Sequence, residues 1–315
     1  MLATILAVAL AASTPVETAV EAPGPQGPLK GTMLAPAGTP RATILIIPGS
    51  GPTDRDGNSP MGVKAAPYKL LAEGLAARGI ATVRIDKRGM FASAGAIPDV
   101  YRVTIPDYAA DVHQWAKAIR ARTGARCLWV LGHSEGALVA LAAAQDAADL
   151  CGIILVSGGG RPLGEVIREQ LRSNPANAPV LPQALPALDA LEAGKKVDTT
   201  NMNPALLPLF SPRVQDFLIS VFSYDPAVLI AKLRLPVLIV QGERDIQVSV
   251  ADAKRLAGAD PAAKLVLLPK ANHVLKAVAS DDRDANIATY SDPSLPLAPG
   301  VVDAIAGFVT APSRK

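Results

Sequence analysis

The sequence predicts an α/β protein with a mostly parallel central sheet, helices on both of its faces and a helical cap insertion. Two observations lead to this prediction. Short β-branched apolar runs alternate with helical patterns along most of the chain, and one Pro-rich helical block interrupts the alternation. The chain has 315 residues, of which 50% are hydrophobic and 19% charged, which is enough for a sizeable core. We therefore expect one large domain with an insertion.

The charge and the hydropathy exclude two classes of protein. Lysine and arginine number 31 against 28 aspartates and glutamates, a net charge of +3, and these charges are scattered along the chain. A nucleic-acid partner would require a basic cluster, so none is expected. No apolar run reaches the roughly 18 residues of a membrane span, so no stable membrane anchor is expected either.

The amino terminus has the pattern of an export signal. Residues 1–12 are apolar, and Ala9 and Ala11 offer an A-x-A cleavage site. We predict a signal peptide at 1–12, a Pro-rich flexible lead at 13–29, and a periplasmic or secreted protein. The first basic residue is only Lys30, so the charged start of a signal is absent. The alternatives are a mis-called start codon, with the basic residues upstream of it, or a short helix packed on the domain. If the segment is not a signal, the protein is expected to be cytoplasmic.

The α/β core is expected at residues 30–159 and 234–315. A hairpin around residues 30–36 precedes the parallel part as an antiparallel edge. Strands are expected at residues 43–47, 80–85, 127–131, 153–156, 236–240 and 264–268. Helices are expected between them at residues 67–78, 106–122, 136–148 and 249–257, and at the end at 301–308.

Residues 160–233 interrupt this alternation. The segment is rich in proline, has helical patterns at 162–172 and 212–222, and contains no convincing strand. A structureless loop of this length is improbable in a compact domain. We predict a helical cap over the carboxyl ends of the strands, where ligands bind in such sheets.

Ser134 is the predicted nucleophile. It stands in Gly132-His133-Ser134-Glu135-Gly136, between an apolar strand and an alanine-rich helix. This is the G-x-S-x-G pattern in its strand–turn–helix context, in which flanking glycines permit a tight turn that exposes the serine.

A serine alcohol needs a base, and the sequence has only three histidines. His133 lies beside Ser134 and cannot turn back to it, and His113 lies within a helix far upstream. His273 follows the last predicted strand, at the edge of the sheet that Ser134 also faces. His273 is therefore the predicted base.

The base in turn needs a carboxylate that fixes its tautomer. Asp245 follows the strand at 236–240, and the order Ser134, Asp245, His273 is the chain order used with this nucleophile turn. Glu243 and Asp225 are rivals. Glu243 is better explained as solvated or paired with Arg244, and Asp225, which precedes a proline, as a helix cap.

An oxyanion requires two donors. We expect one to be the backbone N–H of Glu135 and the other that of Ser50, in the loop Pro48-Gly49-Ser50-Gly51-Pro52 after the strand at 43–47. Gly49 and Gly51 are expected to let this loop approach the substrate. Residues 53–58 are interpreted as a wall held by pairing of its Asp and Arg side chains. They lack the bidentate glutamate of a calcium loop, and no metal site is predicted.

These motifs resemble the α/β-hydrolase superfamily, and more narrowly the bacterial serine carboxylesterases related to the serine aminopeptidase and lysophospholipase (S33-like) branch. The resemblance covers residues 43–308 and also includes Arg84-Ile85-Asp86-Lys87-Arg88-Gly89. It implies an α/β-hydrolase fold, a cap after the sixth strand, a structural turn at 86–89 and activity on short-acyl esters. The usual His-Gly pair of the oxyanion loop is replaced here by Pro48-Gly49.

The predicted function is that of a carboxylesterase that acts through an acyl-enzyme on a small-molecule ester, with no metal or organic cofactor. A peptidase that uses the same triad is one alternative, and a non-catalytic ligand receptor on the same scaffold is another. A dehalogenase would require an aspartate where this chain has Ser134.

The two cysteines begin two strands. If the strands that Cys127 and Cys151 begin are adjacent and parallel, both thiols lie at the same end of the sheet, within reach of a disulfide. A disulfide would fit an oxidising compartment, whereas two free thiols would fit the cytoplasm.

Overall fold

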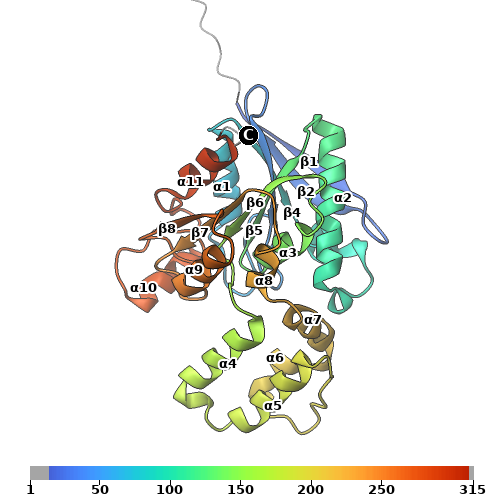
Figure 1. Cartoon of the computed structure of the whole chain (residues 1–315), viewed down its shortest axis with the longest axis vertical. Coiled ribbons are helices and arrows are strands. Elements are labelled where there is room, and N and C mark those ends of the chain that lie inside the picture. The colour runs from blue at the N-terminus through green and yellow to red at the C-terminus, as the bar shows by residue number, and fades with distance from the viewer. Residues whose placement is uncertain (1–13, 312–315) are drawn as a thin grey trace, which may run out of the picture.

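The computed structural model describes residues 14–311, and its centre is a twisted sheet of eight strands (Figure 1). The strand order is β1-β2-β4-β3-β5-β6-β7-β8. Strand β2 pairs antiparallel with both β1 and β4, and all other neighbours pair parallel, so the sheet is mostly parallel, as the sequence predicts. The hairpin expected around residues 30–36 is wrong in position, because those residues are almost wholly the single strand β2, and the hairpin turn lies at residues 23–28. The strands are β1 (Val16–Ala22), β2 (Leu29–Ala35), β3 (Ala42–Ile47), β4 (Ile80–Ile85), β5 (Leu128–His133), β6 (Leu150–Val156), β7 (Val237–Gly242) and β8 (Lys264–Leu268).

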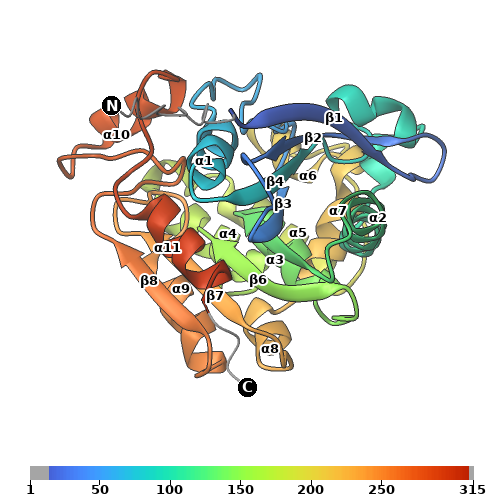
Figure 2. The same ribbon diagram turned by 90° about the horizontal axis from the view of Figure 1, so that it is seen from above.

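Helices cover both faces of the sheet, and Figure 2 shows α1 and α11 on one side and α2 on the other. Alternate residues of one strand point to opposite faces. Ile44 and Ile46 of β3 accordingly join the apolar cluster under α1 and α11, while Leu45 and Ile47 join the cluster under α2 and α3. The core helices are α1 (Pro67–Ala76), α2 (Ile105–Thr123), α3 (Glu135–Ala143), α8 (Pro226–Ile230), α9 (Val250–Ala259), α10 (Arg283–Ala288) and α11 (Val301–Val309).

The prediction of a flexible lead at 13–29 is wrong for most of that segment. Strand β1 pairs with β2 over its whole length and forms one edge of the sheet. Val20 and Ala22 are buried while Glu17, Ala19 and Glu21 are exposed, which is the alternation of a half-buried edge strand. The prediction failed because the prolines on either side of β1 make the composition of this segment similar to that of a linker. The predicted signal peptide at 1–12 lies outside the described residues.

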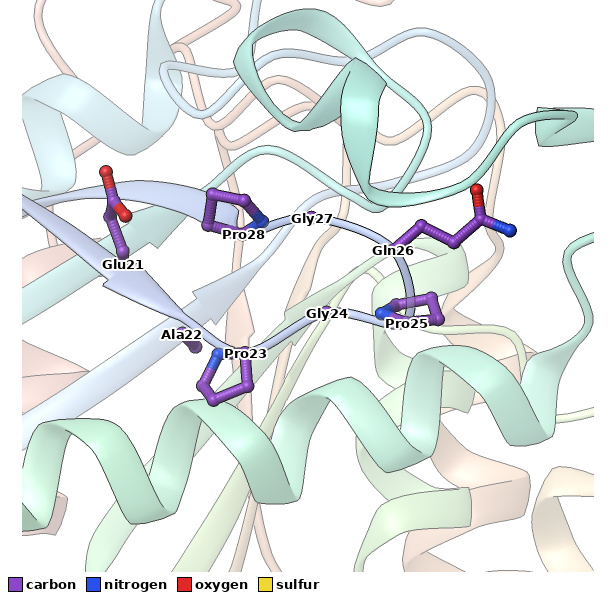
Figure 3. Close-up of a pocket in the computed structure, with 8 residues that line it drawn as sticks. All are labelled: Glu21, Ala22, Pro23, Gly24, Pro25, Gln26, Gly27 and Pro28. Carbon is purple, nitrogen blue, oxygen red and sulfur yellow. The ribbon is translucent and has the colours of Figure 1, made fainter.

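The hairpin loop between β1 and β2 contains the prolines that the sequence associated with a lead. Figure 3 shows Pro23, Pro25 and Pro28 around a surface hollow lined by residues 21–28. The backbone N–H of Gln26 donates to the carbonyl of Ala96, which holds the loop against the neighbouring 3-10 helix. The hollow is built by one hairpin alone, and the predicted catalytic side chains come from other loops.

The inserted segment forms a helical cap with its own apolar core (Figure 1). Its helices are α4 (Leu163–Ser173), α5 (Leu181–Glu192), α6 (Leu207–Phe210) and α7 (Pro212–Phe222). Helix α5 is not apparent from the sequence because Pro186 lies inside it. Helix α8 differs from the prediction, since its Leu229 and Ile230 pack into the core under the sheet and not into the cap.

Both ends of the cap are fastened to α9. At the entrance, the Arg161 guanidinium lies 3.0 Å from the Asp252 carboxylate. At the exit, Asp225 caps α8 and its carboxylate lies 3.0 Å from the guanidinium of Arg255. The same helix therefore holds the chain where it enters the cap and where it leaves the cap.

Among the described helices, none alone has the length and apolarity to cross a membrane. The bent pair Pro204–Phe210 and Pro212–Phe222 passes that test by length and composition.

A disulfide joins Cys127 to Cys151, with 5.2 Å between their Cα atoms. It links the amino ends of the neighbouring parallel strands β5 and β6, far along the strands from Ser134.

We expect the double variant Cys127→Ser/Cys151→Ser to lose about 3 kcal/mol of unfolding free energy, because the bond closes a loop across 24 positions of the unfolded chain. Chemical denaturation of the oxidised wild type and the variant measures the difference. Reduced wild type is the control and should unfold like the variant. Equal stability of the three samples would contradict the prediction.

Candidate active site

Ser134 lies on a strained turn between β5 and α3. Its φ of +54° is in a region that a residue with a side chain seldom occupies. A Cβ atom at Gly132 would collide with the carbonyl oxygen of Gly136, and one at Gly136 would lie 2.5 Å from the carbonyl oxygen of Ile47. The two glycines are therefore required by close backbone approach, as the sequence predicts. The turn leaves Ser134 half-exposed at the carboxyl end of β5.

Asp245 and His273 come together from the loops after β7 and β8. The Nδ1 atom of His273 lies 2.9 Å from Oδ2 of Asp245, and the Asp245 side chain is fully buried. Oδ1 accepts hydrogen bonds from the backbone N–H groups of Gln247 and Val248 at 2.8 and 2.9 Å. These bonds fix the carboxylate so that it can hold the imidazole in one orientation.

The charge state of Asp245 follows from these contacts. Burial by itself raises the pKa of this carboxyl. The charge of His273 and the hydrogen bonds from His273, Val248 and Gln247 outweigh burial, and they hold the pKa below its ordinary value. Asp245 is therefore an acceptor for the Nδ1–H of His273 near neutral pH.

His133 connects the turn of Ser134 with His273. Its ring centroid lies 4.8 Å from that of His273, and its Nε2 lies 2.8 Å from the carbonyl oxygen of His273. Its Nδ1 lies 2.9 Å from the hydroxyl of Tyr68. Within residues 14–311, no hydrogen bond joins the Ser134 hydroxyl to His273 directly. The structure thus joins Asp245 to His273 by a hydrogen bond and brings Ser134 to them through the adjacent His133.

His133 is also a neutral, buried ring. Burial and the neighbouring His273 lower its pKa to about 3, although the hydrogen bond to the His273 carbonyl opposes this shift. In the unfolded chain the ring ionises near pH 6.5. Stability from this group is therefore fully present above that pH and is lost as the pH falls toward 3.

We expect His133→Gln to weaken the acid sensitivity of folding, since glutamine does not titrate. Between about pH 7 and pH 5, the wild type should lose about 1 to 2 kcal/mol more unfolding free energy than the variant. Urea denaturation at the two pH values measures the difference. Equal losses of unfolding free energy in the two proteins would contradict the prediction, because they would mean that His133 binds its proton equally well in the folded and unfolded states.

The predicted oxyanion loop lies against Ser134. A Cβ atom added to Gly49 would lie 3.3 Å from Cβ of Ser134, so this glycine permits the close approach. The N–H of Gly49 donates to the Tyr68 hydroxyl at 3.1 Å. Ser50 is exposed, and its N–H has no acceptor in residues 14–311. Gly51 lies in the exposed turn with φ of +65°.

Glu135 is the first residue of α3, where a backbone N–H has no partner within the helix. Its carboxylate lies 3.2 Å from the ammonium of Lys87, which is buried. Among the described residues, the backbone N–H groups of Glu135 and Ser50 thus have no acceptor, and their segments adjoin or closely approach Ser134.

The predicted wall at 53–58 is held differently from the prediction. The guanidinium of Arg55 pairs with Asp86, from the turn after β4, and not with an aspartate of its own loop. Asp56 pairs with Arg84 instead. The wall is therefore fastened to β4 and to the turn that follows it.

The rivals of Asp245 lie elsewhere. Glu243 is exposed, and Arg244, its expected partner, pairs with Asp281. Asp225 caps α8 by accepting from the N–H of Ala227, as its position before a proline indicates.

The sequence did not reveal Tyr68, Lys87 or the linking role of His133. Of these three, the sequence pointed only toward Lys87, because residues 86–89 match a structural turn of the family. In residues 14–311, no three His, Cys, Asp or Glu side chains gather as metal ligands.

Comparisons with known proteins show the family and the fold of the chain. The family described as serine aminopeptidase, S33, matches residues 60–276. Esterase EstD of Thermotoga maritima is 27% identical over 254 residues, and the match covers 78% of this chain and 58% of that protein. The chain therefore spans less than two thirds of the length of this relative.

Solved structures show the same fold at low identity. Est1E from Butyrivibrio proteoclasticus has a TM-score of 0.55 at 17% identity, covering 86% of this chain and 94% of that one. The alpha/beta hydrolase GrgF from Penicillium sp. sh18 has a TM-score of 0.55 at 20% identity, covering 82% and 91%. A thermophilic esterase from Thermogutta terrifontis has a TM-score of 0.53 at 21% identity, covering 82% and 92%.

The sheet, the two helical layers and the strained serine turn define an α/β hydrolase. With the family match over residues 60–276, the chain belongs to the serine aminopeptidase S33 family.

Proposed function

We propose that the protein is a serine carboxylesterase that cleaves small-molecule esters through an acyl-enzyme. The observation that carries the proposal is the 2.9 Å contact between His273 and the buried Asp245, beside a serine on a strained strand-to-helix turn. A serine, a histidine that can take its proton and a carboxylate that holds the histidine together perform nucleophilic acyl transfer.

In the proposed reaction, His273 takes the proton of Ser134 as Oγ attacks the ester carbonyl carbon. The N–H groups of Glu135 and Ser50 hold the negative charge that develops on the carbonyl oxygen. The tetrahedral intermediate then collapses, and the alcohol leaves with the proton from His273. Water attacks the acyl-enzyme by the same steps, which releases the acid and restores Ser134.

A preference for esters over peptides is supported by the ion pairing of the Glu135 carboxylate and of most cap carboxylates. An aminopeptidase needs a free carboxylate for the α-amino group of its substrate. The carboxylate of Glu135 is paired with Lys87. Most cap carboxylates are paired as well: Glu169 with Arg161, Asp189 and Glu192 with Arg168, and Asp216 with Lys196.

We further propose that the acyl groups are short, on the strength of the sequence resemblance. The test compares p-nitrophenyl esters of increasing acyl length with aminoacyl p-nitroanilides, using the full chain. The proposal expects kcat/KM to be highest for acetyl or butyryl esters and far lower for the anilides. Faster cleavage of the anilides would identify a peptidase instead, and binding of esters without turnover would identify a receptor.

We also propose that the protein is periplasmic or secreted. The Cys127–Cys151 disulfide supports an oxidising compartment. Non-reducing peptide mass analysis of the protein, purified with thiols blocked at lysis, tests this. Recovery of both cysteines in alkylated form from the native location would contradict the proposal.

A further inference from the structure

Lys87 is a buried cation beside the proposed site that the reaction above does not use. Only 3% of the residue is exposed. Its neighbours in the chain are engaged elsewhere, because Asp86 pairs with Arg55 and Arg88 pairs with Asp111. A lysine is seldom buried unless its charge is compensated, so its contacts explain why it is retained there.

The ammonium of Lys87 contacts both segments that flank Ser134. Its Nζ donates to the carbonyl oxygen of Gly49 at 2.6 Å and to Oε1 of Glu135 at 3.2 Å. It also lies 5.3 Å from the ring centroid of Tyr108, a distance suited to a cation–π contact. One cation thus joins the loop after β3 to the first residue of α3.

The bond to Gly49 fixes the direction of a neighbouring donor. The carbonyl of Gly49 and the N–H of Ser50 belong to one peptide plane, and the described peptide bonds are all trans. In a trans peptide the two groups point in opposite directions. Lys87 therefore holds the N–H of Ser50 facing away from itself, while the Tyr68 hydroxyl accepts from the N–H of Gly49 at 3.1 Å and holds the preceding peptide.

The bond from the Lys87 ammonium to the Gly49 carbonyl also polarises the peptide. A cation at the carbonyl oxygen draws electron density through the amide and strengthens its N–H as a donor, since linked hydrogen bonds polarise one another. This polarisation is worth more for the anionic intermediate than for the neutral ester.

We propose that Lys87 is a positioning residue that orients and polarises the Ser50 N–H for the oxyanion. This inference rests on the proposed ester hydrolysis at Ser134. Its consequence is that Lys87 acts on the transition state and contributes little to substrate binding.

The test uses three substitutions of Lys87 and p-nitrophenyl acetate. Lys87→Met removes both the hydrogen bond and the charge, Lys87→Gln keeps a donor without the charge, and Lys87→Arg keeps the charge. Lys196→Met, in the cap, is the matched control for the loss of a paired lysine. We expect kcat to fall about 100-fold in the Met variant, about 10-fold in the Gln variant and least in the Arg variant, with KM changed less than about three-fold.

A second readout separates positioning from general damage. Phenylboronic acid adds to Oγ of Ser134 as an anionic tetrahedral adduct, whereas the ether analogue of the substrate has no carbonyl. The inhibition constant of the boronic acid should rise in proportion to the loss of kcat, and affinity for the ether should be unchanged. If Lys87→Met fails to fold, the Gln variant decides the question by the same measurements.

Two results would overturn the inference. One is a kcat in the neutral variants within about three-fold of the wild type, since one lost oxyanion donor ordinarily costs at least about 100-fold. The other is an equal weakening of boronic acid and ether binding, which would mean that Lys87 only supports the fold. Failure of the proposed function is distinct, because then the wild type itself would not hydrolyse the ester.

Discussion

Replacing Ser134 with alanine should lower kcat for p-nitrophenyl acetate by about 10⁴- to 10⁶-fold, the loss expected when the nucleophile of a catalytic triad is removed. His273 would then have no alcohol to activate, and no acyl-enzyme could form. Residual hydrolysis would come from water that the free N–H groups near Ser134 still assist. Steady-state assays, with active-site labelling by a fluorophosphonate, measure the loss.

The fold should be unaffected by this change. The backbone N–H of Ser134, and not its side chain, holds the turn through a 2.9 Å bond to the carbonyl of Val156. The variant should therefore keep the thermal unfolding midpoint of the wild type. Ester hydrolysis at the wild-type rate in a folded Ser134→Ala protein would refute the assignment of the nucleophile.

Asp245→Asn is the second large effect that we expect, with a fall in kcat of about 10⁴-fold near neutral pH. Asparagine can present its NH₂ group to Nδ1 of His273 and so favour the tautomer that protonates the wrong nitrogen. It also removes the negative charge that stabilises the imidazolium. The KM should change far less than kcat, because Asp245 is fully buried and does not contact the substrate.

Asp225→Asn is the matched control, since Asp225 is the rival carboxylate. Asparagine is as good a helix cap as aspartate, so the substitution should remove only the exposed ion pair with Arg255. Activity of this variant should equal that of the wild type. Equal, small losses in the two variants would mean that Asp245 is not the partner of the base.

The parts of the site that the sequence could predict are those with fixed positions on the fold. Ser134 was identifiable because it lies between Gly132 and Gly136, two positions where close backbone contacts leave no room for a side chain. Asp245 and His273 were identifiable because each follows an apolar strand, and the carboxyl ends of parallel strands meet at one edge of the sheet. The sheet itself followed from its β-branched runs.

The remaining features depend on contacts between distant segments. Strand β1 gains its structure from pairing with β2, which outweighs the linker-like prolines around it. Lys87 looks like part of a surface turn, and only the fold places its ammonium on the carbonyl of Gly49, 38 positions earlier in the chain. Helix α5 tolerates Pro186 because its Leu188 and Leu191 are buried in the core of the cap.

The cap is attached to the core at its two ends and also along α7, whose Val221 is buried in the main core and whose Ser220 hydroxyl accepts from the backbone N–H of Ile105. The cap has its own apolar core, and both of its ends are secured to α9 by ion pairs, Arg161 with Asp252 and Asp225 with Arg255. Residues buried only within the cap can therefore vary without disturbing the sheet, whereas α7 must keep the side chains that cover α2 and the main core.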